Sequence, residues 1–316
     1  MSSKPLEMRE AVIGEITRRM EDDESIFFLC ADLGARKLDY LRDHFADRFI
    51  NVGIAEQNLI NISAGLALEG YNVYAYAISS FITTRCYEQI RVNLSILSQV
   101  REMNVNLIGV GAGYSYIMSG PTHQALEDIS IIRTLPNMEI VSPSDWVCSQ
   151  AFVDYSLKVK SPKYIRLDSV PLKQIYQHAS DIRIEKGFSE LMKGDKVCII
   201  STGYMTHKAI LVAEKLSKEN ISVGLIDIFL LKGFDGKSLE SALKPYSNLV
   251  TMEEGFVNKG GLDALINSFI REFNLSIKLE SVGISDHYCF HIGSRDSMHE
   301  LNNMSVESII KKIKRY

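Results

Sequence analysis

A glutamate in the segment Asn51–Asn58, which reads NVGIAEQN, has a setting that suggests chemistry. Gly53 permits a tight turn after an apolar approach, and Glu56 follows at or just inside an expected helix start. A helix N-terminus stabilises negative charge, so a carboxylate is tolerated there. The local pattern is consistent with two roles for Glu56, which are contact with a ligand and a simple helix cap.

A histidine held by a turn is the second candidate. The segment Gly120–Gln124 reads GPTHQ, in which the Gly-Pro pair predicts a turn and His123 directly precedes an expected helix. Histidines in such places suit proton transfer or ligand contacts. A purely structural histidine is the alternative that the pattern leaves open.

An arginine inside an apolar strand is the third candidate. Arg166 lies near the carboxyl end of the run Tyr164–Leu167, which is where α/β sheets bind ligands. Its forked guanidinium suits a phosphate group, and a salt bridge at the rim of the sheet is the alternative. Phe81 and Tyr87 carry a weaker signal, because their spacing is also that of ordinary core aromatics.

The glycine-rich stretch Gly109–Gly113 follows an expected strand and superficially resembles a phosphate-binding loop. It lacks the G-x-G-x-x-G spacing and the Lys-Ser/Thr pair of a P-loop. We therefore expect a flexible loop at the strand end. In the second half of the chain, His287 and His291 have a spacing that could bind a metal on a helix, but no helical pattern surrounds them, so we expect an ordinary loop.

Composition and charge narrow the function classes. The 316 residues are 46% hydrophobic and 23% charged, which is typical of a soluble globular protein. The net charge of −4 argues against a nucleic-acid or anionic-membrane partner. No run approaches the roughly 20 apolar residues of a membrane span, and the polar N-terminus lacks the apolar core of a secretion signal. Five scattered cysteines without a CxxC pair indicate reduced thiols, so we expect a cytoplasmic location.

Short apolar runs alternate with helical patterns, which predicts parallel sheets with helices on both faces. The fold class expected is α/β, with two doubly wound domains, each a mainly parallel sheet flanked by helices. The domains are predicted at 1–170 and 186–316, joined by a linker over 171–185. Strands are expected over 25–30, 73–77, 105–110, 139–142, 163–167, 196–201, 223–229, 248–252 and 277–282. Helices are expected over 58–68, 87–100, 125–134, 145–157, 206–218, 261–273 and 305–312.

Taken in this order, these segments resemble the transketolase family and its relative 1-deoxyxylulose-5-phosphate synthase. The likeness runs over nearly the whole chain and covers the pyrimidine-binding and C-terminal domains of that family. The glutamate segment and GPTHQ are the specific motifs. The supporting matches are Ser79–Phe81 with Arg85 and Tyr87, Pro143–Asp145, and Thr251–Glu254 with the glycine pair at 260 and 261.

The resemblance implies a thiamine diphosphate site. In this family a glutamate at the position of Glu56 hydrogen-bonds N1′ of the aminopyrimidine, and a protonated carboxyl there favours the imino tautomer that activates the cofactor. Phe81 and Tyr87 match aromatic residues of the pyrimidine pocket, and Ile54 in the glutamate motif is placed at the cofactor too. The implied activity moves a two-carbon ketol unit from a ketose, such as a ketose phosphate, to an aldose, with the cofactor as electron sink.

Substrate contacts also follow from the resemblance. His123 matches a histidine that approaches the reacting carbon and substrate hydroxyls, and Arg166 matches an arginine that holds the acceptor phosphate. The chain departs from the family at three positions: Thr84 replaces an aromatic residue, Ser119 replaces an acid that reads an acceptor hydroxyl, and Gly111 replaces a histidine. Ser119 remains a candidate substrate contact, and a dedicated biosynthetic sugar is an open alternative to the standard pentose phosphates.

A partner chain is implied by what the sequence lacks. The family anchors the diphosphate through Mg²⁺ with a Gly-Asp-Gly segment, and none occurs here. The resemblance therefore implies that an N-terminal, diphosphate-binding subunit holds the metal and that two copies of each chain form an α2β2 heterotetramer with the cofactor at the interface.

Three other functions stay open. The first is a beta subunit of a thiamine-dependent 2-oxo-acid dehydrogenase, which does not usually carry the compact GPTHQ form. The second is one half of a deoxyxylulose-phosphate synthase. The third is a non-catalytic relic that acts as an interaction subunit, against which intact Glu56, His123 and Arg166 argue.

Overall fold

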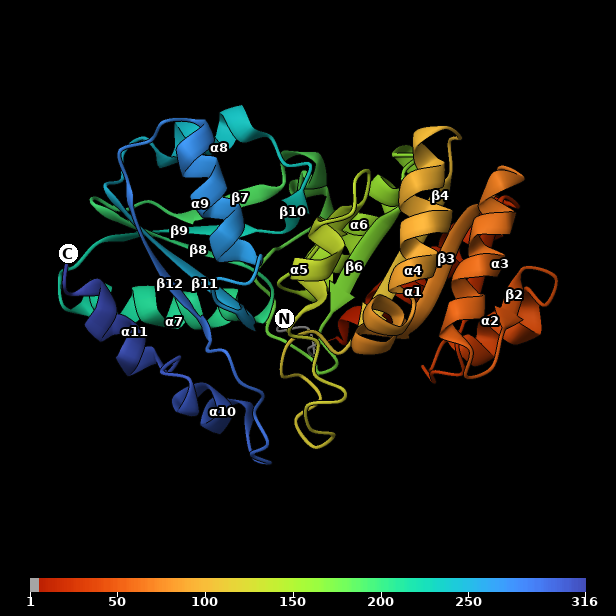
Figure 1. Ribbon diagram of the computed structural model, residues 1–316, viewed down its shortest axis with the longest axis horizontal. Helices are drawn as coiled ribbons and strands as arrows, with labels where there is room; N and C mark the ends of the chain where they lie inside the picture. Colours follow the sequence, from red (N-terminus) through yellow and green to blue (C-terminus); the bar gives the residue numbers. More distant parts are fainter. Residues whose placement is uncertain (1–5) are drawn as a thin grey trace.

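The apolar runs of the sequence form the strands of two sheets in the computed structural model, which describes residues 6–316 (Figure 1). The first sheet has seven strands in the order β10-β5-β6-β4-β3-β1-β2, and the second has five in the order β12-β11-β8-β9-β7. Neighbouring strands are parallel except at one edge of each sheet, where β10 and β7 pair antiparallel. The predicted fold class, two mainly parallel sheets flanked by helices, is confirmed.

The first sheet is buried on both faces, which is why its strands are continuous apolar runs. Its strands in chain order are β1 (Ile26–Cys30), β2 (Phe49–Asn51), β3 (Asn72–Ile78), β4 (Asn104–Val110), β5 (Glu139–Val141), β6 (Lys163–Leu167) and β10 (Leu230–Lys232). The β3–β4 register pairs Asn72 with Asn104 and Ile78 with Val110, so the two strands end at the same level. The loops that follow them therefore emerge side by side.

Two layers of helices cover this sheet. On one face lie α1 (Met8–Asp22) and α6 (Trp146–Lys158), whose apolar side chains pack with β1 and β3 residues such as Phe28 and Tyr74. The other face carries α3 (Glu56–Leu68), the segment Tyr87–Gln99 built from α4, η2 and η3, and α5 (Asp128–Arg133). The short helix α2 (Leu38–His44) lies before β2.

The second sheet consists of β7 (Phe188–Met192), β8 (Val197–Ser201), β9 (Val223–Ile228), β11 (Asn248–Phe256) and β12 (Lys278–Ile284). Helices α8 (Gly236–Leu243) and α9 (Leu262–Glu272) cover one face, and α7 (Tyr204–Lys218) and α11 (Val306–Ile313) cover the other (Figure 1). The helix α10 (Arg295–Leu301) follows a loop that protrudes on the α7 side. One apolar cluster contains residues of both sheets, such as Ile140 and Ile226, so the two halves share a core.

Each strand and helix predicted from the sequence occurs, with ends shifted by a few residues. Elements that the patterns missed include α1, α2, α8 and α10. The structure also differs from a clean division of the chain, because β10 of the second half crosses over to pair with β5 of the first sheet. Residues 171–185 contain the short 3-10 turn Ala179–Asp181, the start of a second at Ile184–Lys186, and no strand. In the part of the chain that is described, no helix is both long and apolar enough to cross a membrane.

Candidate active site

The predicted site residues gather at the carboxyl ends of parallel strands. Glu56 follows β2, Phe81 follows β3, and His123 closes the loop that follows β4. In open α/β sheets ligands bind at this edge, because the loops there converge while the strands stay rigid. These three residues therefore lie at the edge of the sheet where a ligand is expected to bind.

Glu56 begins α3, and its side chain is buried apart from 9% of its surface. The N-cap position is Ala55, which makes no side-chain cap. Among residues 6–316, the hydrogen-bond partner recorded for the Glu56 carboxylate is Arg85, whose Nη1 donates to Oε1 at 3.1 Å. Gln57 fixes the same arginine from the other side by donating Nε2 to its carbonyl oxygen at 3.0 Å. Glu56 thus contacts a neighbouring loop, and the cap interpretation does not describe it.

The segment Phe81–Arg85 forms a π-helical turn, a wide turn that often occurs at functional sites. Threonine hydroxyls bond back to the preceding turn, as when Thr83 Oγ1 donates to the Ser79 carbonyl at 2.7 Å. This turn places the Arg85 guanidinium 3.8 Å from the centre of the Phe81 ring, which is a cation–π contact. Arg85 therefore joins the Glu56 carboxylate to the Phe81 ring.

His123 completes the connected set. Its ring meets Phe81 edge to face with centroids 5.0 Å apart, and it meets Tyr116 nearly perpendicularly at 6.2 Å. Its Nδ1 lies 2.9 Å from Thr122 Oγ1. Ser80 Oγ donates to the Thr122 carbonyl at 3.3 Å, which ties the two loops together. An acid, a base and an aromatic face are thereby brought to one edge of the sheet.

Other predicted residues lie at the margin of this set. Ile54 is 79% exposed, and Ser119 is exposed in the loop, where its N–H donates to the Tyr116 carbonyl at 3.3 Å. Tyr87 is half-buried, and its hydroxyl lies 2.7 Å from Thr134 Oγ1 at the end of α5. The structure therefore does not bring these three side chains into the contacts that join Glu56 to His123.

Arg166 differs from the setting that its predicted role requires. It is 4% exposed, and Nε and Nη2 donate to the two oxygens of Asp128 at 2.8 and 3.2 Å. Nη2 also donates to the Ala125 carbonyl at 3.3 Å, and Asp128 accepts from the Tyr164 hydroxyl at 2.7 Å. A guanidinium paired in this way offers no open fork to a substrate phosphate. The alternative of a salt bridge describes Arg166 better, although the bridge is buried and not at the rim.

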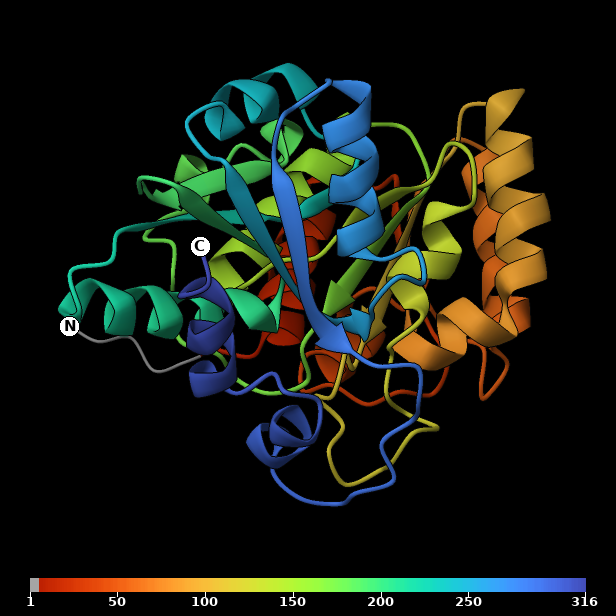
Figure 2. The ribbon, with the colours of Figure 1, turned by 60° about the vertical axis from the view of Figure 1, so that its left-hand side comes forward.

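A buried ionic cluster, whose Glu254 and Arg295 lie in the second half of the chain, holds the loop that carries His123. Arg295 Nε donates to Glu254 Oε1 at 2.7 Å and its Nη1 to Asp168 at 2.6 Å. The Tyr114 N–H in the loop donates to Glu254 Oε2 at 3.1 Å. Burial opposes ionisation of Glu254, but Arg295 and His299 prevail and hold the pKa of this carboxyl far below its usual range. Figure 2 shows this loop in yellow beside the blue loop that precedes α10.

Sequence reasoning missed this cluster. The Glu253-Glu254 pair in the segment Thr251–Glu254 indicated an acidic position of the family motif. The arginine and histidine that bind Glu254 lie about 40 residues further along the chain, so the sequence did not connect them with it. His287 and His291 take no part in the cluster. His291 lies in an exposed loop, with Nε2 3.1 Å from Ser297 Oγ, and the segment around both histidines is a loop as expected.

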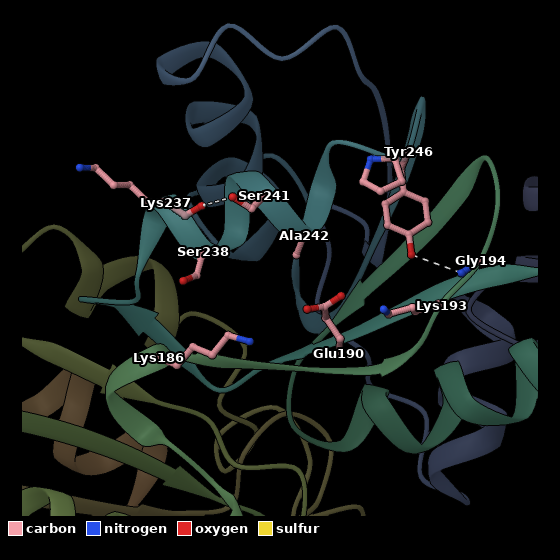
Figure 3. Close-up of a pocket in the computed structure, with 10 residues that line it drawn as sticks. Lys186, Glu190, Lys193, Gly194, Lys237, Ser238, Ser241, Ala242 and Tyr246 are labelled. Atoms are coloured by element: carbon pink, nitrogen blue, oxygen red, sulfur yellow. Dashed lines mark hydrogen bonds between the residues drawn. The ribbon is translucent and has the colours of Figure 1, made fainter.

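A cavity of about 560 Å³ lies away from these residues. It lies between β7 and α8 and is lined by residues of the second half, among them Lys186, Glu190, Lys237 and Tyr246 (Figure 3). It shares no residue with the set around Glu56 and His123. Within residues 6–316 no three His, Cys, Asp or Glu side chains come together as they would to hold a metal ion.

The donor set around Glu56 suits an aromatic nitrogen heterocycle. A carboxyl can hydrogen-bond a ring nitrogen, and Phe81 offers a ring for stacking. An α/β domain with these groups at its carboxyl edge, followed by a second α/β domain, is the arrangement of thiamine-diphosphate enzymes. Residues 4–170 match the family model described as "Transketolase, pyrimidine binding domain", and residues 189–309 match "Transketolase, C-terminal domain". The chain belongs to the transketolase family, whose members use thiamine diphosphate.

Its relatives include components of split transketolases. The chain is 32% identical over 267 residues to an apulose-4-phosphate transketolase subunit of Actinobacillus succinogenes, with 84% of each chain covered. It is 29% identical to the 6-deoxy-6-sulfo-D-fructose transketolase subunit SqwH of Clostridium sp., with 96% and 92% covered. A solved structure described as a split gene transketolase, inactive beta4 tetramer, is similar with a TM-score of 0.85 and 29% identity, with 99% and 98% covered.

Proposed function

We propose that this chain is the subunit of a thiamine-diphosphate-dependent transketolase that binds the cofactor's aminopyrimidine. With a partner subunit it moves a two-carbon ketol unit from a ketose, such as a ketose phosphate, to an aldose acceptor. The observation that carries this proposal is the continuous contact from the Glu56 carboxylate through Arg85 and Phe81 to His123. A non-catalytic protein that retained only the fold would not need a buried acid, an aromatic face and a histidine in contact at the ligand-binding edge.

Each residue has a task in this proposal. The Glu56 carboxyl holds a proton at N1′ of the pyrimidine, and the Phe81 ring packs against the heterocycle. Arg85 pairs with Oε1 of Glu56 in the isolated chain. His123 faces the substrate, where its ring nitrogen binds a hydroxyl or moves its proton. Thiamine diphosphate, when bound, supplies a nucleophilic carbon and an electron sink for breaking a carbon–carbon bond.

The surface beside the site supports a partner chain. Ile54 is 79% exposed directly before Glu56, and Met118 in the His123 loop is 72% exposed. In this proposal the partner chain covers these two side chains. We propose that the partner supplies the diphosphate and Mg²⁺ sites and that the assembly is an α2β2 heterotetramer. All five cysteines are unpaired thiols, which supports a cytoplasmic location.

Reconstitution with the N-terminal partner tests the proposal. Both chains are purified together with thiamine diphosphate and Mg²⁺, and ketol transfer is assayed on a panel of phosphorylated ketoses and aldoses. The panel also contains pyruvate with glyceraldehyde 3-phosphate, and 2-oxo acids with an electron acceptor. Ketol transfer supports the proposal. Activity confined to either of the latter substrates points to a synthase half or a dehydrogenase subunit, and complex formation without any turnover points to an interaction subunit.

A further inference from the structure

Gly111 and Tyr116 form a matched pair at the start of the His123 loop. Gly111 follows β4 directly and has a φ of +105°, a conformation that favours glycine. A Cβ atom on Gly111 would lie 2.3 Å from Cε2 and 2.4 Å from Cδ2 of the Tyr116 ring. The ring therefore occupies the space of a side chain at position 111, and such a side chain would have to displace it.

The same ring borders His123. The two ring planes stand at 83° with centroids 6.2 Å apart, and Phe81 approaches His123 from another direction at 5.0 Å. Tyr116 is half-buried, and burial raises the pKa of its hydroxyl, which the charges of Arg9 and Asp168 also affect. The ring of Tyr116 lies beside the His123 ring.

The loop holds Tyr116 firmly in this place. The Tyr114 N–H is bound by Glu254, and a Cβ on Gly113 would lie 2.0 Å from Oε2 of the same carboxylate. On the other side, Ser169 Oγ donates to the Ser115 carbonyl at 3.2 Å. These contacts fix the two residues before Tyr116, and the Ser119 N–H donates to the Tyr116 carbonyl at 3.3 Å, so the loop holds this backbone without a ligand.

We propose that Tyr116 is a specificity-determining residue of this site. Its ring carbons lie beside His123. They fill the space in which a side chain at position 111 could present a polar group. An aromatic face offers no hydrogen bond to a hydroxyl, but it packs well against C–H groups. At the Tyr116 ring the site therefore recognises a sugar through a C–H face or a deoxygenated carbon, and not through a hydrogen bond to a hydroxyl. The ring also selects sugars by their length. This inference rests on the proposed transketolase function.

Variants of the reconstituted holoenzyme test this role. Tyr116→Ala removes the ring that borders His123. Tyr116→Leu keeps most of the side-chain volume without the aromatic ring, and Tyr116→Phe keeps the ring without the hydroxyl. Gly111→Ala displaces the ring from the other side. Tyr155→Ala is the control, because Tyr155 is a half-buried tyrosine of α6 outside the site. The acceptors are erythrose 4-phosphate, ribose 5-phosphate, 2-deoxyribose 5-phosphate and glycolaldehyde.

The readout is the ratio of kcat/KM between acceptors. Tyr116→Ala removes the apolar ring and Gly111→Ala displaces it. Each should change the ratio of kcat/KM between acceptors by about tenfold or more, because pocket contacts of this size discriminate between substrates by about that factor. Tyr116→Phe and Tyr155→Ala should leave the ratio unchanged, and thiamine affinity should be unaltered in every variant that folds by circular dichroism. Tyr116→Leu should shift the ratio in the same direction as Tyr116→Ala but less.

Two results overturn the role of Tyr116 while the wild type remains active. One is an equal loss of kcat/KM on all acceptors, which a structural defect alone would produce. The other is a Tyr116→Phe ratio as altered as that of Tyr116→Ala, which would assign the effect to the hydroxyl. A wild-type complex that binds no thiamine diphosphate and transfers no ketol unit removes the proposed function as well.

Discussion

The rings of Phe81 and His123, 42 positions apart in the chain, meet edge to face with centroids 5.0 Å apart. Phe81 follows β3 and His123 closes the loop after β4, and the parallel register of these neighbouring strands brings both to one level. Arg85 extends the contact to Glu56. The glutamate motif and the histidine motif, which are separate in the sequence, therefore belong to one connected set of contacts.

Glu56→Gln should abolish ketol transfer by the reconstituted enzyme while the partner subunit still binds. The amide keeps the shape of the side chain but cannot hold the carboxyl proton at the pyrimidine nitrogen. Initial rates and size-exclusion chromatography of the complex measure the two effects. Glu88→Gln is the matched control, because Glu88 is exposed in the same region and should keep full activity. Normal turnover in Glu56→Gln would remove the role of this carboxyl.

Phe81→Leu should weaken thiamine diphosphate binding about three- to tenfold, because stacking on a ring contributes about 0.5–1.5 kcal/mol beyond burial. Titration of the cofactor into the apo complex, followed by tryptophan fluorescence or calorimetry, measures the dissociation constant. Phe273→Leu is the control, since Phe273 stacks on Phe269 far from the site, in the second half of the chain. A dissociation constant equal to that of wild type would exclude the ring contact.

Arg166→Met should destabilise the chain by about 3–5 kcal/mol, because it leaves the buried Asp128 carboxylate without its partner. Replacing both residues, as Arg166→Met with Asp128→Asn, should recover part of the loss. Urea unfolding of the single chain measures the free energy, and Arg183→Met at an exposed ion pair should change it little. Unchanged stability together with a higher KM for phosphorylated acceptors would instead favour the phosphate role predicted from the sequence.

Stability should depend on pH through Asp227, a buried carboxyl that accepts hydrogen bonds from Ser144, Tyr176 and Thr206. Burial raises the pKa of Asp227 to about 6. Because the folded value lies above the unfolded one, its contribution is fully present below the unfolded pKa and is lost as the pH rises through 6.

The free energy of unfolding of wild type, minus that of Asp227→Asn, should therefore fall between about pH 4 and pH 6, by about 3 kcal/mol at most, and stay level above pH 7. Urea titrations at each pH measure it. Asp47→Asn, at an 82% exposed side chain, is the control and should give a flat difference. The buried Glu253, with a pKa raised to about 7, titrates in both proteins, so its effect cancels. A pH-independent difference for Asp227→Asn would contradict the assignment.

Local signals predicted most of the fold. The alternation of apolar runs and helical stretches gave the order of strands and helices, and the turn residues marked the loops that carry Glu56 and His123. The antiparallel edge strand β10 was not accessible in this way, because pairing across 90 residues leaves no mark on either segment alone. The same holds for the π-helical turn at Phe81–Arg85, which no local periodicity predicted.

The sequence by itself determined the α/β class and the transketolase resemblance, and it singled out the acid, the aromatic residue and the histidine that we propose for the site, since periodicity and motif spacing are properties of contiguous residues. Tertiary structure alone decided that Arg166 pairs with Asp128 inside the protein, that Arg85 links Glu56 to Phe81, and that the Tyr116 ring takes the place of a side chain at Gly111. These relationships depend on which side chains meet when distant segments pack together. Packing is set by the whole chain, so no local pattern encodes it.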